Sequence, residues 1–217
     1  MAESCVYCGT TENLTAEHAP PKLIFAEPRP SDLITVRACL TCNQAGQKDA
    51  EYFRWCLSVD PETEDTPGVA AIRPAVVRSL DRPQAQGFRA VMLASMKVDP
   101  PFLKIHVNTS RINETVRRIV RCLYVHEVGH RLPTTEYVGV VTPQRLERFR
   151  ETTKEGFKQI VMRRLLRRPE RRVAGGDFAY VFMHADKPFS SLWAVLFFRV
   201  HGYFVFTSEP RQKPAAE

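Results

Sequence analysis

The chain has 217 residues, 44% of them hydrophobic, with a formal net charge of +7 and a pI of about 9.3. This is enough apolar material for one domain of average size with a small appended module. The longest apolar runs, such as Leu192–Phe198, are far shorter than the roughly 20 residues that span a bilayer, so we expect no membrane partner. No secretory signal is evident, so we expect a cytoplasmic protein whose six cysteines are thiols or metal ligands.

The first 57 residues contain two CxxC pairs separated by thirty residues. The cysteines are Cys5, Cys8, Cys39 and Cys42. Each pair places two thiolates on one tight turn, and two such turns complete a tetrahedron around zinc. We therefore predict a structural zinc site at 1–57, whereas Cys56 and Cys122 have no partner at ligand spacing and are expected to be buried.

Between and just after the pairs, Glu17 and His18 are adjacent, "DLITV" leads into the second pair, and Asn43 follows Cys42. This ordered set resembles the HNH nuclease family over residues 5 to about 53. The resemblance implies a zinc-stabilised ββα module, a hairpin and a helix folded around one divalent cation.

The resemblance also implies roles for individual residues. His18 would be the general base that deprotonates the attacking water, and Glu17 would be a ligand of a catalytic Mg²⁺ or Mn²⁺ ion. Asn43 would be the second ligand of that ion. Asp32 stands where the family commonly has an asparagine that orients the base through the hairpin, and Lys48 could meet a phosphate. Two residues depart from the family pattern, because Glu17 stands in place of an aspartate and Asp32 in place of an asparagine. These departures leave an alternative, a non-catalytic zinc-ribbon protein that binds nucleic acid.

The middle segment, 58–101, reads as a proline-rich connecting region. The acidic stretch at 59–68 is broken by prolines and predicts a loop. Short helices are expected at 68–80 and 88–96, and a helix at 45–57 precedes the segment.

From residue 102 to 217 the pattern predicts a basic α+β domain. We expect a strand at 102–107, a helix capped by Thr109 or Ser110 and running to about Arg131, and a strand at 136–141. A basic helix is expected from Pro143 to about Arg168. Three strands at 178–184, 191–200 and 203–208, with turns at 185–190 and 201–202, would form a C-terminal antiparallel sheet. The predicted fold class is therefore α+β.

The stretch HEVGH at 126–130 matches the HExxH pattern of zinc peptidases. His126 and His130 are four residues apart and could face one ion, with a third ligand from Glu136, Glu147 or Glu151. Pro133 and the arginines of this helix favour a structural or phosphate-facing helix end. A zinc peptidase is thus the third hypothesis.

Positive charge is concentrated between Pro143 and Arg172, where eleven Lys or Arg residues face four glutamates. Such a block favours a polyanionic partner, and we expect double-stranded DNA. The candidate contacts are Arg163, Arg164, Arg167 and Arg168. The leading hypothesis is a metal-dependent HNH-type endonuclease. A homodimer is possible, because double-strand cutting by a nuclease with one site per chain would favour a dimer.

Overall fold

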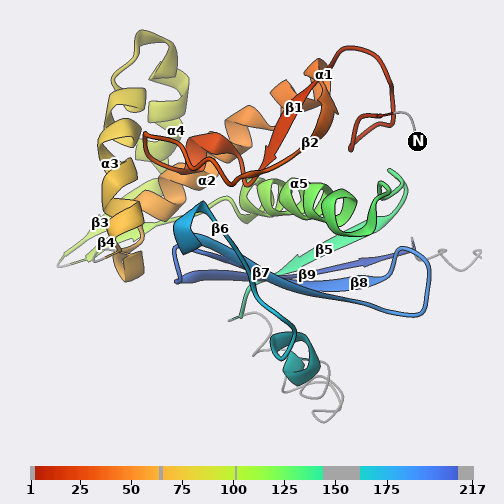
Figure 1. The fold of residues 1–217 in the computed structure, drawn as a ribbon. Helices are drawn as coiled ribbons and strands as arrows, with labels where there is room; N and C mark the ends of the chain where they lie inside the picture. Colours follow the sequence, from red (N-terminus) through yellow and green to blue (C-terminus); the bar gives the residue numbers. More distant parts are fainter. Residues whose placement is uncertain (1–2, 64–65, 101, 144–161, 210–217) are drawn as a thin grey trace, which may run out of the picture.

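The computed structural model describes residues 3–63, 66–100, 102–143 and 162–209. The fold is α+β, as predicted. A long central helix, α5 (Thr109–Val128), lies between a small hairpin with its following helices on one side and a five-stranded antiparallel sheet on the other (Figure 1). No helix among the described residues is long and apolar enough to cross a membrane.

The N-terminal unit is a hairpin followed by two helices. Strands β1 (Leu14–Ala19) and β2 (Ile34–Cys39) pair antiparallel, with Leu14 opposite Cys39 and Ala19 opposite Ile34. The short helix η1 (Lys22–Ile24) lies in the connection between the strands. Helix α1 (Leu40–Ala45) begins directly after β2, and α2 (Gln47–Val59) follows it. The expected order of two strands and a helix is present.

The connecting segment is largely helical. It contains η2 (Pro61–Thr63), α3 (Pro67–Leu80), η3 (Pro83–Ala85) and α4 (Gln86–Ser95), close to the predicted helices. The strands β3 (Met96–Asp99) and β4 (Phe102–Ile105) form a second hairpin. Buried Val69, Ile72 and Val76 give α3 an apolar face at helical spacing, and α3 packs against α2.

Helix α5 (Thr109–Val128) has the predicted apolar stripe, but both of its ends differ from the prediction. Asn108 caps the helix, because its side chain accepts hydrogen bonds from the backbone N–H groups of Ser110 and Arg111. Gly129, with φ of 81°, adopts the left-handed conformation and ends the helix three residues earlier than expected.

The sheet has the strand order β5-β9-β8-β7-β6, with all pairs antiparallel. The strands are β5 (Tyr137–Val141), β6 (Arg171–Val173), β7 (Phe178–His184), β8 (Ser191–Phe197) and β9 (His201–Ser208). The 3-10 turn η5 (Ala174–Gly176) joins β6 to β7. Residues of β8 alternate between buried and half-buried, which is the pattern of a sheet with one covered face.

The second predicted turn of the sheet is wrong in position. His201 and Gly202 belong to β9, and the chain reverses at Phe198 and Arg199, which both have positive φ. Phe198 is almost fully buried and its ring lies 6.1 Å from that of Phe25. Burial of this side chain, which sequence spacing cannot show, overrides the local preference for glycine in the turn.

One hydrophobic core joins the hairpin, α2, α5 and the sheet, and so includes side chains from both 1–57 and 102–217. Phe53 of α2, for example, packs edge-on against Phe197 of β8 at 5.0 Å. Most of the basic helix predicted from Pro143 to about Arg168 lies outside the described residues. In its described part, residues 162–166 are helical.

Candidate functional site

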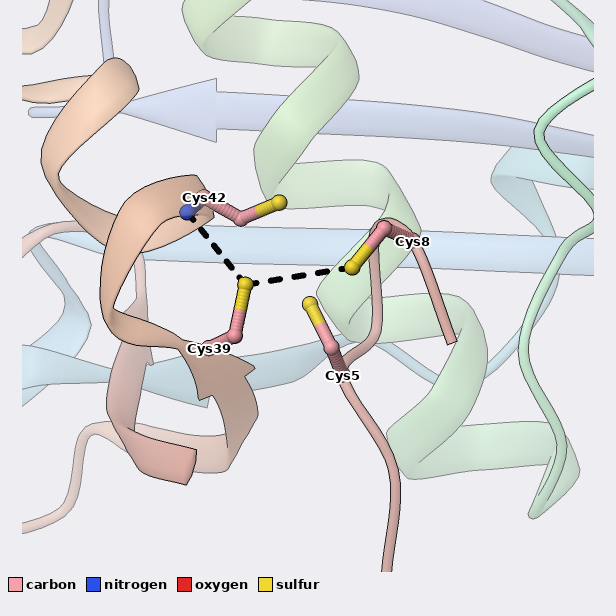
Figure 2. Close-up of side chains that lie close together, drawn as sticks. All are labelled: Cys5, Cys8, Cys39 and Cys42. Carbon is pink, nitrogen blue, oxygen red and sulfur yellow. Dashed lines mark hydrogen bonds between the residues drawn. The ribbon is translucent and has the colours of Figure 1, made fainter. Parts of the chain in front are cut away.

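The four cysteines of the two CxxC pairs come together, as predicted. Their sulfur atoms all lie within 4.8 Å of one another, and the Sγ atoms of Cys8 and Cys39 are 3.8 Å apart (Figure 2). Four thiolates at about 2.3 Å from a zinc ion would stand about 3.8 Å apart. None of the cysteines forms a disulfide. The cluster could therefore hold one zinc ion.

The thiols of this cluster differ in acidity. Burial raises the pKa of Cys5, but hydrogen bonds from the backbone of Cys8, Cys39 and Tyr7 outweigh it and lower the pKa to about 6. The pKa of Cys42 is raised by burial, by its hydrogen bonds to the neighbouring sulfurs and by the negative charge of Cys5. The charge of one thiolate thus raises the pKa of the next thiol, and a bound cation would offset that repulsion between negative charges.

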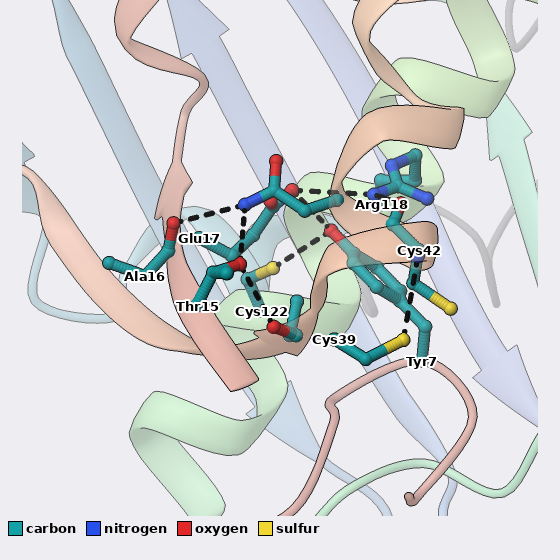
Figure 3. Close-up of polar contacts among 10 residues, drawn as sticks. Tyr7, Thr15, Ala16, Glu17, Cys39, Cys42, Arg118 and Cys122 are labelled. Carbon is teal, nitrogen blue, oxygen red and sulfur yellow. Dashed lines mark hydrogen bonds and ion pairs between the residues drawn. The ribbon is translucent and has the colours of Figure 1, made fainter. Parts of the chain in front are cut away.

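Helix α5 supports the second CxxC turn through Arg118. Its Nη2 donates to the carbonyl oxygen of Cys42 at 2.7 Å and to Oε1 of Glu17 at 3.4 Å (Figure 3). The guanidinium group also lies over the ring of Tyr7, 3.8 Å from its centroid. A Cβ atom at Gly46 would collide with the Arg118 side chain, so a larger residue there would require that side chain to move.

The side chain of Glu17, on strand β1 of the hairpin, is buried. Its Oε1 accepts a hydrogen bond from the hydroxyl of Tyr7 at 2.7 Å, and that hydroxyl also lies 3.3 Å from Sγ of Cys122. Burial raises the pKa of the Glu17 carboxyl, while the hydrogen bond from Tyr7 and the charge of Arg118 act in the opposite direction. Cys122 is buried, as expected, whereas Cys56 is only partly buried.

Asn43 and His18 lie on adjoining parts of the same unit. The side-chain amide of Asn43 donates to Oγ1 of Thr15 and to the carbonyl oxygen of Ala16, both at 3.1 Å, so α1 is tied to β1. His18 is half-buried on β1, and burial together with the charge of Lys22 lowers its pKa.

A cavity of about 640 Å³ brings four of the five predicted hairpin-and-helix residues together. Glu17, His18, Asn43 and Lys48 all line it. Asp32 does not lie among the lining residues; it is exposed, and its carboxylate accepts a hydrogen bond from the backbone N–H of Ala174 at 3.0 Å. In this structure Asp32 therefore ties the hairpin loop to η5.

The cavity is strongly basic, which the sequence did not indicate. Its lining includes seven cationic side chains, Lys22, Arg29, Lys48, Arg54, Arg78, Arg82 and Arg118. Three glutamates oppose them, Glu17, Glu27 and Glu51. The cations come from the hairpin connection, α2, α3, the turn after α3, and α5. Only Lys48 and the α5 arginine were singled out in the sequence, and no motif or charge run marks the other five.

The predicted contacts Arg163, Arg164, Arg167 and Arg168 are all exposed. They lie at and just after the short helix 162–166, which Figure 1 shows beyond the sheet and away from the hairpin. They are therefore separate from the basic cavity.

The HEVGH segment is divided by the end of α5. His126 lies in the last helical turn, but His130 follows Gly129 and packs edge-on against the rings of Tyr124 and Phe189. Glu127 is held by Arg171 and the hydroxyl of Tyr180. In the part of the chain that the structure describes, the four-cysteine cluster is the only group of three or more potential ligands from His, Cys, Asp and Glu. Glu147 and Glu151 lie outside that part.

No protein-family model, curated protein or solved structure matches this chain. The resemblance to HNH nucleases therefore depends on the residues described above alone.

Proposed function

We propose that the protein is a metal-dependent endonuclease that hydrolyses phosphodiester bonds in DNA. The observation that carries this proposal is the shared cavity, where an imidazole, a carboxylate and a carboxamide lie among an excess of Lys and Arg side chains. The four-cysteine cluster, directly beside Asn43 in the chain, would be the structural zinc site of an HNH-type module.

His18 is the proposed general base. Its lowered pKa keeps the imidazole neutral at physiological pH, so that a ring nitrogen can accept a proton from water. Half-burial on β1 limits its movement while leaving it in contact with the cavity. Neither property requires the family resemblance.

Glu17 and Asn43 are the proposed ligands of a divalent cation. The two hydrogen bonds of the Glu17 carboxylate both go to Oε1, which leaves Oε2 as the donor for a metal. The amide nitrogen of Asn43 is bound to the hairpin, which leaves Oδ1 as the second donor. Oxygen donors suit Mg²⁺ or Mn²⁺, which would stabilise the charge that develops on the phosphate during cleavage.

A non-catalytic zinc-ribbon protein would use the same basic cavity only to bind nucleic acid. The nuclease and the binding protein differ in whether His18 is needed to hydrolyse a phosphodiester bond. A binding protein would retain salt-dependent affinity and show no cleavage dependent on a divalent cation.

The test is nicking of supercoiled plasmid by zinc-loaded protein with added Mg²⁺ or Mn²⁺. We expect His18→Ala to lower the rate at least about 100-fold, the usual contribution of a general base. His106→Ala is the matched control, because His106 is exposed between β4 and α5 and is not a lining residue of the cavity. Equal nicking by the parent and His18→Ala proteins would exclude His18 as the base, and absence of nicking by the parent would favour the binding protein.

A further inference from the structure

One end of the cavity contains a buried arginine whose hydrogen-bonding capacity is only partly used. Arg54 of α2 is 8% exposed and lines the cavity. Its Nη1 donates to the carbonyl oxygen of Leu23 at 3.4 Å and its Nη2 donates to Oγ of Ser79 at 3.2 Å. Within the described residues, Nε has no hydrogen-bond partner. A buried guanidinium with an unused donor is costly unless an anion meets it.

The surroundings of Arg54 add positive charge. Burial lowers the pKa of Arg54, and among its neighbours Arg29 and Arg82 lower it further while Glu51 raises it. Arg78 lines the same cavity, and its neighbour in the chain, Ser79, accepts the hydrogen bond from Arg54. Neither Arg78 nor Arg82 forms an ion pair with any residue that the structure describes. Arg29 is paired with Glu27 at 2.7 Å, so the unpaired cations that share the cavity with the buried donor are Arg78 and Arg82.

This end is continuous with the proposed catalytic residues. Lys22 is near enough to His18 to lower its pKa, and the backbone carbonyl of Lys22 accepts a hydrogen bond from Arg29 at 2.9 Å. Arg54 binds the next carbonyl, that of Leu23. The segment around η1 thus joins the imidazole to the cationic end of the same cavity.

Among the residues that the structure describes, no phenylalanine, tyrosine or tryptophan lines the cavity. Proteins that bind single strands usually stack exposed bases on such rings, whereas contacts from Arg and Lys to phosphate fix a duplex without reading its sequence. The chemistry of this end therefore suits the nucleic-acid backbone and not its bases.

We infer that Arg54, Arg29, Arg78 and Arg82 form a second phosphate subsite, which holds a backbone phosphate of duplex DNA near the one that is cleaved. The inference builds on the proposed nuclease function and gives that site its substrate class. The exposed half of this subsite is Arg78 of α3 and Arg82 just after that helix, both in the segment that the sequence marks as a connecting region.

The test measures duplex binding by fluorescence anisotropy at several salt concentrations, with zinc-loaded full-length protein and no added Mg²⁺ or Mn²⁺. The variant is Arg78→Ala/Arg82→Ala, which leaves the buried Arg54 in place and changes only exposed side chains. Arg89→Ala/Lys97→Ala removes the same charge from exposed positions on α4 and β3 outside the cavity, and is the matched control.

We expect the variant to bind unrelated duplex sequences equally weakly, with affinity reduced about tenfold or more. Its slope of log affinity against log salt should fall by about 2, one for each lost phosphate contact. The control should stay within about twofold of the parent. Equal slopes for the variant and the control would overturn the subsite. So would binding of inorganic phosphate or a mononucleotide that depends on Arg78 and Arg82 while duplex affinity does not.

The plasmid assay separates this inference from the proposed function. If the parent nicks DNA while the variant binds duplex as the parent does, the subsite is refuted and the nuclease stands. If the variant loses the salt slope while the parent never nicks, the subsite is supported and the nuclease is refuted.

Discussion

Replacing Arg118 by methionine should destabilise the N-terminal unit more than any change at an exposed cation. Methionine keeps the length and helix preference of the side chain but removes its charge and all of its donors. The Arg118 side chain is only 14% exposed and contacts Cys42, Glu17 and Tyr7. It therefore connects α5 to both the cysteine cluster and the hairpin.

The magnitude follows from these contacts. A hydrogen bond from a charged donor to the carbonyl of Cys42 contributes about 1.5–3 kcal/mol. Stacking on the Tyr7 ring contributes about 0.5–2 kcal/mol. Glu17 would remain buried without its cation, although its raised pKa lets it take up a proton. We expect a loss of about 3 kcal/mol in the free energy of unfolding, the scale measured when one partner leaves a buried ion pair.

The assay is urea unfolding of zinc-loaded protein followed by tryptophan fluorescence, since Trp55 and Trp193 are both buried. Arg89→Met, at an exposed position on α4, should change the free energy by no more than about 0.5 kcal/mol. A double-mutant cycle with Glu17→Gln should give a coupling energy of about 1 kcal/mol or more. A loss below about 1 kcal/mol with no coupling would refute the claim that Arg118 joins the two elements.

Three further predictions concern the metal cluster, the end of α5 and the packing of Gly46. Cys8→Ser, at an exposed position of the cysteine cluster, should remove bound zinc and lower Tm by roughly 10 °C. His126→Ala should leave the zinc content, measured by elemental analysis, unchanged, because His126 is not part of the cluster. Glu127→Gln should cost about 1–2 kcal/mol at pH 7, because hydrogen bonds from Arg171 and Tyr180 lower the pKa of this carboxylate despite burial. Stability from a lowered carboxylate pKa is lost as pH falls through the folded pKa, so in unfolding curves the difference from the parent should shrink progressively as pH falls below the usual glutamate pKa of 4.5. Gly46→Ala should destabilise by about 1–3 kcal/mol because its methyl group collides with Arg118, and the cost should shrink in the Arg118→Met background. Equal costs in both backgrounds would contradict that collision.

The features that the sequence predicted well are those that local spacing determines. The helical period of Ile112, Val116, Ile119 and Leu123 located α5, and the period-two patterns located the strands of the sheet. The two CxxC spacings predicted the cysteine cluster, since each pair needs only one turn of the backbone to form.

The features that the sequence missed depend on contacts between distant segments. Arg118 and Glu17 are 101 positions apart, and nothing local to either residue identifies the partner. Arg78, on α3, and Arg82, in the turn between α3 and η3, read as ordinary surface cations in the sequence. They reach the cavity because α3 packs against α2. The HEVGH pattern shows the opposite case, in which local spacing predicts a site that the fold does not form. The spacing fits a metal site, but Gly129 ends the helix between the two histidines.

The cysteine cluster and the proposed catalytic residues are coupled through a short stretch of chain. Cys42 is a cluster residue and Asn43 lines the cavity, so any movement of the second CxxC turn also moves Asn43. The carbonyl of Cys42 binds Arg118, which in turn binds Glu17, so the carboxylate would shift as well. Under the proposed function, loss of a zinc ion held by the four cysteines should therefore abolish cleavage even if the proposed catalytic cation never binds the cysteines. It follows that loss of activity on chelation cannot identify the catalytic ion, whereas restoring Mg²⁺ or Mn²⁺ to zinc-loaded protein can.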